Sequence, residues 1–148
     1  MSYTSLHYHI VFSTKERRTF LDPNGDERLN AYFGGMIRNM KAKLHCVNNT
    51  ADHIHLAVGL HPSVSVSSFV GTIKTNSSKW IHETFESLQT FSWQEGYSAF
   101  SVSYSGMDKV IQYIENQQAH HKKLSFEEEL MRLLEKHHIK YDPKYVFK

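Results

Sequence analysis

Residues 52–58 read DHIHLAV, a buried-strand pattern that carries two histidines two residues apart. Successive side chains of a strand point to opposite faces of its sheet, so His53 and His55 share one face. Ile54, Leu56 and Val58 share the other face and can pack against a hydrophobic core. The stretch therefore predicts a strand that buries its apolar side chains and presents two imidazoles on the opposite side.

The histidine spacing alone does not identify a metal site. The chain holds 11 histidines in 148 residues, which gives roughly one His-x-His by chance. A second copy is present at His7-Tyr8-His9. Paired imidazoles at this spacing can bind a divalent metal, so the rest of the chain decides between a site and a coincidence.

Strand and helix patterns alternate around this stretch. Apolar residues repeat with strand or helix spacing in six segments, which are strands over residues 6–13, 46–49, 52–60 and 99–105 and helices over residues 29–44 and 66–81. The order β-α-β-β-α-β predicts an α+β, ferredoxin-like (RRM-like) fold, in which four antiparallel strands carry helices on one face. Its first and third strands are central neighbours, so the open face should carry His7, His9, His53 and His55.

Two more helices are predicted after the last strand, over residues 107–123 and 125–137. In the first of them Tyr113 and Gln117 are four residues apart and therefore share one face. A half-exposed tyrosine beside a surface glutamine is the commoner reason for such a pair. Tyrosine is also a nucleophile where a metal polarises its target, and two imidazoles with an amide oxygen can hold such a metal.

The composition is that of one ordinary globular domain. The 148 residues are 40% hydrophobic and 22% charged, and we expect a single domain over residues 1–148, with a core over about 6–121 and a C-terminal helix and tail over 124–148. The one cysteine, Cys46, excludes an intrachain disulfide and fits a reducing compartment. Without a signal-peptide pattern or an apolar run long enough to span a membrane, we expect a cytoplasmic protein with no membrane partner.

Positive charge is concentrated in part of the chain. The net charge is only +2, but residues 28–79 hold six basic side chains against one acid. Residues 15–18 add a basic cluster, and acids gather at residues 127–129. Although a solvated helix face is the commoner role of a charge run, the asymmetry suits a polyanion, and we predict phosphate contacts by Arg17, Arg18, Lys74 and Lys79.

Five motifs follow one another along the chain and carry a family resemblance. They are YHIVFSTK with RR (residues 8–15 and 17–18), DHIHL (52–56), IK with SKWI (73–74 and 78–81), WQEGY with FSVS (93–97 and 100–103), and YIENQ (113–117). Each motif is weak alone, but the five in register resemble the one-tyrosine HUH single-strand DNA transposases of bacterial insertion sequences, the IS200 type. The resemblance covers about residues 6–121.

The resemblance implies an enzyme that cuts and rejoins single-stranded DNA near hairpins at the ends of a mobile element. The family's tyrosine falls on Tyr113, which would attack the scissile phosphodiester to give a 5′-phosphotyrosine and a free 3′-hydroxyl. The metal-binding histidine pair falls on His53 and His55 and the third ligand on Gln117, with Mg²⁺ or Mn²⁺ as the cofactor. His9 matches a histidine common in the family's first strand, and we assign it a supporting role.

The resemblance also implies the partners. They are single-stranded DNA with hairpins and a second copy of the chain, in a homodimer where one subunit's tyrosine helix can complete the other's site. No nucleotide cofactor is needed, because the phosphotyrosine stores the bond energy. Such an enzyme would work in the cytoplasm of a bacterium or archaeon, at the nucleoid when it acts. Residues 124–148 match the family less clearly, and we assign them no chemistry.

Two alternative functions are compatible with parts of the sequence. A domesticated relative would use similar chemistry on repeated chromosomal palindromes, but the intact segment 113–117 and the lack of a basic tail favour the autonomous transposase. A non-catalytic ferredoxin-like module would bind nucleic acid through aromatic side chains on its open sheet face. Here that face is predicted to show histidines and serines, and the fold alone does not decide.

Overall fold

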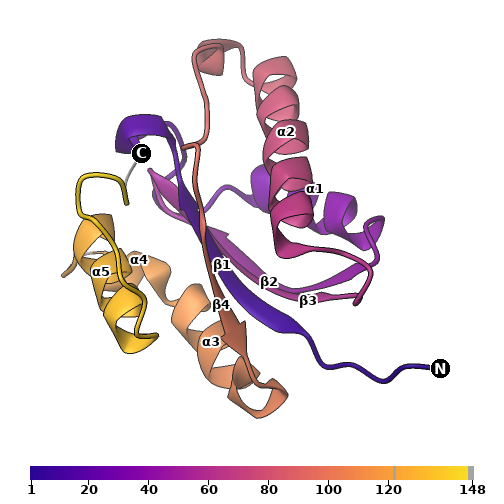
Figure 1. The fold of residues 1–148 in the computed structure, drawn as a ribbon. Helices are drawn as coiled ribbons and strands as arrows, with labels where there is room; N and C mark the ends of the chain where they lie inside the picture. The colour runs from indigo at the N-terminus through magenta and orange to yellow at the C-terminus, as the bar shows by residue number, and fades with distance from the viewer. Residues whose placement is uncertain (122, 147–148) are drawn as a thin grey trace.

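A four-stranded antiparallel sheet forms the centre of the molecule (Figure 1). The structure is a computed structural model that describes residues 1–121 and 123–146. The strands are β1 (His7–Ser13), β2 (Ala42–Asn49), β3 (His53–Leu60) and β4 (Ser98–Val102). They lie in the order β2-β3-β1-β4, and all neighbours are antiparallel. This order, with β1 and β3 as central neighbours, confirms the predicted ferredoxin-like α+β fold.

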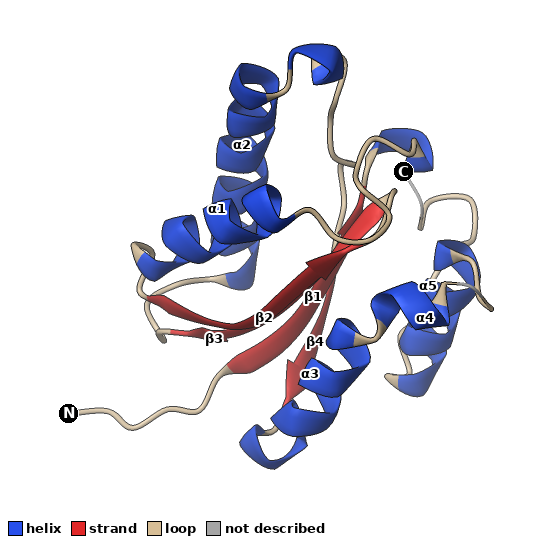
Figure 2. Ribbon diagram, turned by 180° about the vertical axis from the view of Figure 1, so that it is seen from behind, coloured by secondary structure: helices blue, strands red, loops and turns tan. Residues whose placement is uncertain are grey.

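Helices α1 (Glu27–Arg38) and α2 (Val66–Thr84) cover one face of the sheet (Figure 2). Each begins at a capping side chain, since Asp26 accepts from the amides of residues 28 and 29, and Ser65 accepts from the amide of residue 68. Ile54, Leu56 and Val58 are fully buried in this layer, as their alternation predicts. Burial of each such side chain stabilises the fold by about 1.5–3 kcal/mol.

The other sheet face is covered as well, so the expectation of an open face was wrong. Three C-terminal helices pack on it: α3 (Met107–Glu115), α4 (Gln117–His120) and α5 (Phe126–Lys136) (Figure 1). Met107 and Ile114 contact Ala57 of β3, while apolar side chains of α5 contact Val11 and Phe100. The apolar stripes of these helices account for this, because an unpaired stripe gains free energy only by leaving water. The predicted histidine face is therefore an interior between sheet and helices.

The predicted helix over residues 107–123 is broken into α3 and α4 at Asn116. Asn48 of β2 supplies a reason, because its amide donates to the Ile114 carbonyl at 2.8 Å. In a continuous helix that carbonyl would accept from the amide of residue 118. The Asn48 and Gln118 side chains also pair with each other at 3.0 Å. This contact ties the end of α3 to the sheet and fixes where the following turn points.

Three short 3₁₀ turns complete the chain at Lys15–Arg17, Glu86–Leu88 and Tyr104–Gly106. The first of them follows β1 directly and holds Glu16 at a φ of 56°. No helix in the described part of the chain is long and apolar enough to cross a membrane.

Candidate metal and nucleophile site

His53 and His55 lie side by side on the inner face of β3, beneath the C-terminal helices. Both side chains are fully buried, and their ring centroids are 5.1 Å apart. The register of the sheet places Ser13 opposite His53 and Val11 opposite His55. The strand alternation that starts at Asp52 thus delivers both imidazoles to one enclosed place.

Asp52 orients His53 toward the interior. The Nδ1 of His53 lies 2.7 Å from Asp52 Oδ1 and 2.8 Å from Thr50 Oγ1. A carboxylate only accepts, so Nδ1 carries a proton and Nε2 faces the site. There Nε2 lies 3.4 Å from the Gln117 Oε1 and 3.4 Å from the Glu129 Oε1. Burial alone would lower the pKa of His53, but hydrogen bonds to Asp52 and Glu129 raise it. Two acceptor oxygens facing one ring nitrogen call for a positive charge between them, from a proton or a metal.

His9 of β1 supports His55. The Nε2 of His9 lies 2.8 Å from the Nδ1 of His55, and the two rings are stacked at 5.1 Å. Burial lowers the pKa of His55 to about 4, and burial together with His55 lowers the pKa of His9. Both imidazoles are therefore neutral at pH 7, which is the state that binds a metal. This geometry suits the supporting role assigned to His9, which stays a prediction.

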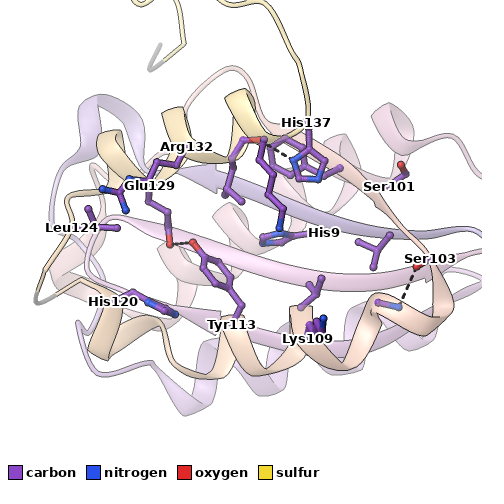
Figure 3. A pocket seen from close by; sticks show the side chains of 16 residues that line it. His9, Ser101, Ser103, Lys109, Tyr113, His120, Leu124, Glu129, Arg132 and His137 are labelled. Atoms are coloured by element: carbon purple, nitrogen blue, oxygen red, sulfur yellow. Dashed lines mark hydrogen bonds between the residues drawn. The ribbon is translucent and has the colours of Figure 1, made fainter.

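Tyr113 of α3 and Gln117 of α4 reach the same place from the covering helices. Gln117 is fully buried, and its Nε2 donates to Glu129 Oε2 at 3.0 Å. The Tyr113 hydroxyl donates to the same carboxylate oxygen. Figure 3 shows Tyr113 and Glu129 pointing toward one another between α3 and α5. The structure thus brings together the predicted nucleophile and the three predicted metal ligands.

The sequence prediction missed two residues of the site: it gave His121 no role, and it missed Glu129 of α5 because we assigned residues 124–148 no chemistry. The Glu129 side chain is only 2% exposed. One carboxylate oxygen, Oε1, lies 3.0 Å from His55 Nε2 and 3.3 Å from His121 Nε2, whereas Oε2 accepts from Tyr113 and Gln117. A signal was present in the sequence, since Glu129 occupies the apolar stripe of its helix with Phe126, Leu130 and Leu134. An acid in such a stripe has to find partners in the interior.

The residues present fit a divalent metal. Ligand atoms of His53, His55, His121 and Glu129 all lie within 4.8 Å of one another, and the Gln117 Oε1 lies 3.0 Å from His121 Nε2. Imidazole nitrogens mixed with carboxylate and amide oxygens suit Mn²⁺ well and Mg²⁺ through its oxygen ligands. Burial and the neighbouring Glu129 carboxylate raise the pKa of Tyr113, which favours the neutral phenol. A divalent cation held by these ligands would reverse that local field.

Comparison with known proteins decides the family. The family described as "Transposase IS200 like" matches residues 2–117. The chain belongs to this family. Transposases for insertion sequence element IS200 from Salmonella typhimurium and Salmonella typhi are each 32% identical over 119 residues, which cover 74% of this chain and 75% of theirs. The chain is accordingly an enzyme of the transposase class, which decides against the non-catalytic binding module.

Two solved structures resemble the fold of this transposase. A putative transposase from Deinococcus radiodurans superposes with a TM-score of 0.64 at 26% identity, over 78% of this chain and 93% of its own. A REP-associated tyrosine transposase bound to a REP hairpin superposes with a TM-score of 0.61 over 100% of this chain and 90% of its own. The second match has 15% identity and shows a common fold alone.

His7 lies outside the buried cluster, although it shares the sheet face with it. Its Nδ1 lies 3.1 Å from His45 Nε2 of β2, and its ring packs near the exposed Tyr104. The sequence prediction that all four histidines of β1 and β3 gather in one place therefore holds only for His9 and the β3 pair. His7 is the first residue of β1, two residues before His9, and lies opposite Gly59.

The four basic residues predicted to contact phosphates lie in different places. Arg17 forms a salt bridge with Glu127 at 2.8 Å, and Arg18 pairs with Glu16 at 3.2 Å on the surface. Lys74 and Lys79 belong to α2, on the opposite side of the sheet from Tyr113. The Lys74 ammonium donates to the backbone carbonyls of residues 94, 95 and 96. The structure does not bring these four side chains together, and their DNA contacts stay a prediction.

Proposed function

We propose that this transposase cuts and rejoins single-stranded DNA at hairpin-marked ends of an insertion sequence, through a 5′-phosphotyrosine at Tyr113. The observation that supports it best is the meeting of Tyr113 with His53, His55 and Gln117 at one buried place. A tyrosine that served only to pack would need neither the buried histidine pair nor the buried amide. Because these side chains can hold a divalent cation next to the tyrosine, the same arrangement supports a metal-dependent reaction.

The proposed reaction follows from the groups around Tyr113. The phenol oxygen attacks the scissile phosphorus, the bond from tyrosine oxygen to phosphorus forms, and the bond from phosphorus to the 3′-oxygen breaks. Glu129 Oε2, which already accepts from this hydroxyl, takes up the phenol proton transiently, and the proton is passed on to the 3′-oxygen, which leaves as a hydroxyl. Attack of a 3′-hydroxyl on the phosphotyrosine reverses these changes and rejoins DNA, so no nucleotide cofactor is consumed.

The two carboxylate oxygens of Glu129 have different roles in the proposed reaction. Oε1 faces His55 and His121 and would be a metal ligand, whereas Oε2 faces Tyr113 and would accept its proton. Mg²⁺ or Mn²⁺ held by His53, His55, Gln117 and Glu129 would polarise the phosphate and stabilise charge on the leaving oxygen. Asp52 and His9 orient the two imidazoles from behind.

The proposed partner is a second copy of the chain. Strand β4 is at an edge of the sheet, and its outer backbone groups can pair with another edge strand. Within one chain Tyr113 already faces its own histidine pair. A homodimer in which the tyrosine helices are exchanged would therefore replace one complete site by an equivalent one. We place this dimer in the cytoplasm, at the nucleoid.

An adduct assay tests the reaction. Purified protein is incubated with hairpin-bearing single-stranded oligonucleotides and Mn²⁺ or Mg²⁺, and products are separated on a denaturing gel. Wild type should form a covalent protein–DNA adduct that chelator prevents, and Tyr113→Phe should bind the hairpin without forming it. Tyr104→Phe is the matched control, because Tyr104 is 73% exposed and outside the site. Normal adduct yield from Tyr113→Phe, activity in chelator, or a preference for duplex DNA would each contradict the proposal.

A further inference from the structure

A cavity of about 650 Å³ lies between α3 and α5, over β4 and the His9 side chain (Figure 3). We call it the α3–α5 cavity. Its lining includes Tyr113 and Glu129, so the cavity reaches the hydroxyl that is proposed to attack DNA. Cavities of this size commonly hold an organic ligand. The chemistry of the remaining walls indicates which ligand this one suits.

Three basic side chains line the α3–α5 cavity from both sides. Lys109 comes from α3, and Arg132 and Lys136 come from α5. None of the three forms a salt bridge with an acid in the part of the chain that the structure describes. Among the described residues that line it, Glu129 is the one acid, and its carboxylate is already engaged by its buried partners. The cavity therefore has an excess of positive charge that is available to an anion.

Apolar and ring surfaces lie between these cations. Val102, Val110, Leu124 and Leu133 belong to the lining, and the His137 ring is stacked on Phe100 at 4.4 Å with an interplanar angle of 25°. Proteins that bind single-stranded nucleic acid combine cations along the backbone with ring surfaces on which bases stack. A small anion would use the cations but not these walls. The combination suits a polymer that alternates phosphates with flat, apolar bases.

We propose that the α3–α5 cavity binds the single DNA strand next to the bond that Tyr113 cuts, with Lys109, Arg132 and Lys136 paired to its phosphates. This inference rests on the proposed function, because the continuity of the cavity with Tyr113 is what assigns DNA to it. A volume of about 650 Å³ has room for roughly one or two nucleotides and excludes a duplex. The strand has to be single where it meets the tyrosine, even if a hairpin lies further along.

These cations are separate from the four predicted from charge clustering. Lys74 and Lys79 lie on the opposite side of the sheet, and Arg17 and Arg18 lie in the turn after β1. The cavity cations come from segments that look ordinary in the sequence, because Lys109, Arg132 and Lys136 alternate with acids along their helices. Only the packing of both helices on the same sheet face places them around one space.

The first test measures strand binding without cleavage. Labelled oligothymidylate is titrated in chelator into wild type and into the triple variant Lys109→Gln, Arg132→Gln, Lys136→Gln at several salt concentrations. Each lost phosphate contact should lower the slope of log affinity against log salt by about 0.7, so the triple variant should lose about 2. The matched control is Arg38→Gln, an exposed residue of α1 on the other face. An unchanged slope in the triple variant, or no binding by wild type, overturns the assignment.

The second test maps the strand directly. Ser101 is exposed and lines the cavity, so Ser101→Cys offers a thiol there. The native Cys46 interferes little, since burial raises its thiol pKa to about 11 and leaves little reactive thiolate. Oligothymidylate should slow maleimide labelling of Ser101→Cys several-fold and leave the exposed control Ser87→Cys unaffected. Equal rates with and without DNA, or equal protection by polyglutamate, overturn the assignment.

The two proposals fail in different ways. If wild type forms no adduct with hairpin DNA but both binding tests succeed, the proposed reaction is wrong and the cavity remains a strand-binding site. If adduct forms and the triple variant keeps its salt slope and its Michaelis constant for DNA, the reaction stands and the cavity assignment falls.

Discussion

Glu129→Gln is the substitution that best tests the architecture of the site. The carboxylate of Glu129 holds α5 to the sheet and to α3, because it contacts His55, His121, Tyr113 and Gln117 at once. An amide has nearly the same shape but no charge, and it has one acceptor oxygen in place of two. The variant therefore removes the electrostatic and hydrogen-bonding role of Glu129 and leaves its packing in place.

The expected cost follows from the contacts. Five donor groups face the carboxylate, with His53 the most distant at 3.4 Å, and the amide oxygen of a glutamine can serve about half of them. Each buried donor left without an acceptor costs about 1–3 kcal/mol, and the loss of a buried ionic partner costs about 3–5 kcal/mol. We therefore expect Glu129→Gln to lower the free energy of unfolding by about 3 kcal/mol. The total for a domain is about 5–15 kcal/mol, so the variant should still fold.

Urea unfolding of metal-free protein at pH 7 measures the loss of unfolding free energy in Glu129→Gln. With a slope of about 2 kcal/mol/M, a loss of 3 kcal/mol lowers the midpoint by about 1.5 M. The matched control is Glu128→Gln, because Glu128 is the exposed neighbour and hydrogen-bonds to the helix cap at Ser125. It should change the midpoint by a few tenths of a molar at most. Equal midpoints for Glu129→Gln and wild type would refute the view that this carboxylate fastens α5 over the site.

The pH dependence gives a second check on the same variant. Hydrogen bonds from His121, His53 and His55 outweigh burial and hold the pKa of Glu129 far below its ordinary value of 4.5. A carboxyl whose folded-state pKa is lowered stabilises the fold above its unfolded-state pKa and loses that contribution as the pH falls. The stability difference between wild type and Glu129→Gln should be full at pH 7 and should shrink below about pH 4.5. A difference that grows on acidification would contradict the assigned charge state.

Three further predictions concern the metal, the dimer and the basic residues. Mn²⁺ at about 100 times its dissociation constant should stabilise wild type by about 2.7 kcal/mol, as measured by thermal unfolding with and without Mn²⁺. His53→Ala should lose this increment. Gln117→Ala should lose less of it, because water can replace an amide ligand. A mixed dimer of a Tyr113→Phe chain with a His53→Ala chain, isolated through two tags, should recover about half the wild-type adduct rate if the tyrosine helices are exchanged, and none if each serves its own chain. Lys74→Met should lower stability by about 1–3 kcal/mol through its three carbonyl contacts, whereas Lys79→Gln should leave stability unchanged and lower the salt slope of DNA binding by about 0.7–0.9.

The fold was predictable because its signals are local. Strand alternation in β1 and β3 and helical spacing in α1 and α2 each follow from the need to bury one face, and their order leaves few topologies. What the sequence did not show is which face the C-terminal helices cover. The apolar stripe of α5 predicts that this helix packs against something. The side chains that it contacts, Val11 and Phe100, belong to two strands that are far from α5 in the sequence. Only the assembled sheet brings these two side chains to one surface.

The site was predictable where a single segment sets the geometry. The spacing of His53 with His55 is fixed within β3, and the resemblance supplied the chemistry. Tyr113 and Gln117 were expected on one continuous helix; the chain is broken between them at Asn116, and both side chains still reach the Glu129 carboxylate. Neither the local spacing of residues nor the family resemblance points to Glu129. The family match ends at residue 117, and in sequence the acid run 127–129 reads as the first turn of a solvated helix. Tertiary packing gives Glu129 its role, and local patterns do not report tertiary packing.

The position of Glu129 also bears on how Tyr113 could be exchanged between two chains. To leave its own site, α3 has to break the contact of Tyr113 with Glu129 and the contact of Asn48 with the Ile114 carbonyl. Both contacts form again if α3 of the partner docks in the same way, so the exchange is nearly neutral in free energy at equilibrium. The barrier is different, because both contacts are lost while the helix is in transit. Glu129 and Asn48 therefore act on the rate of exchange, and a chain that folds with Tyr113 on its own histidines keeps that arrangement until α3 is released.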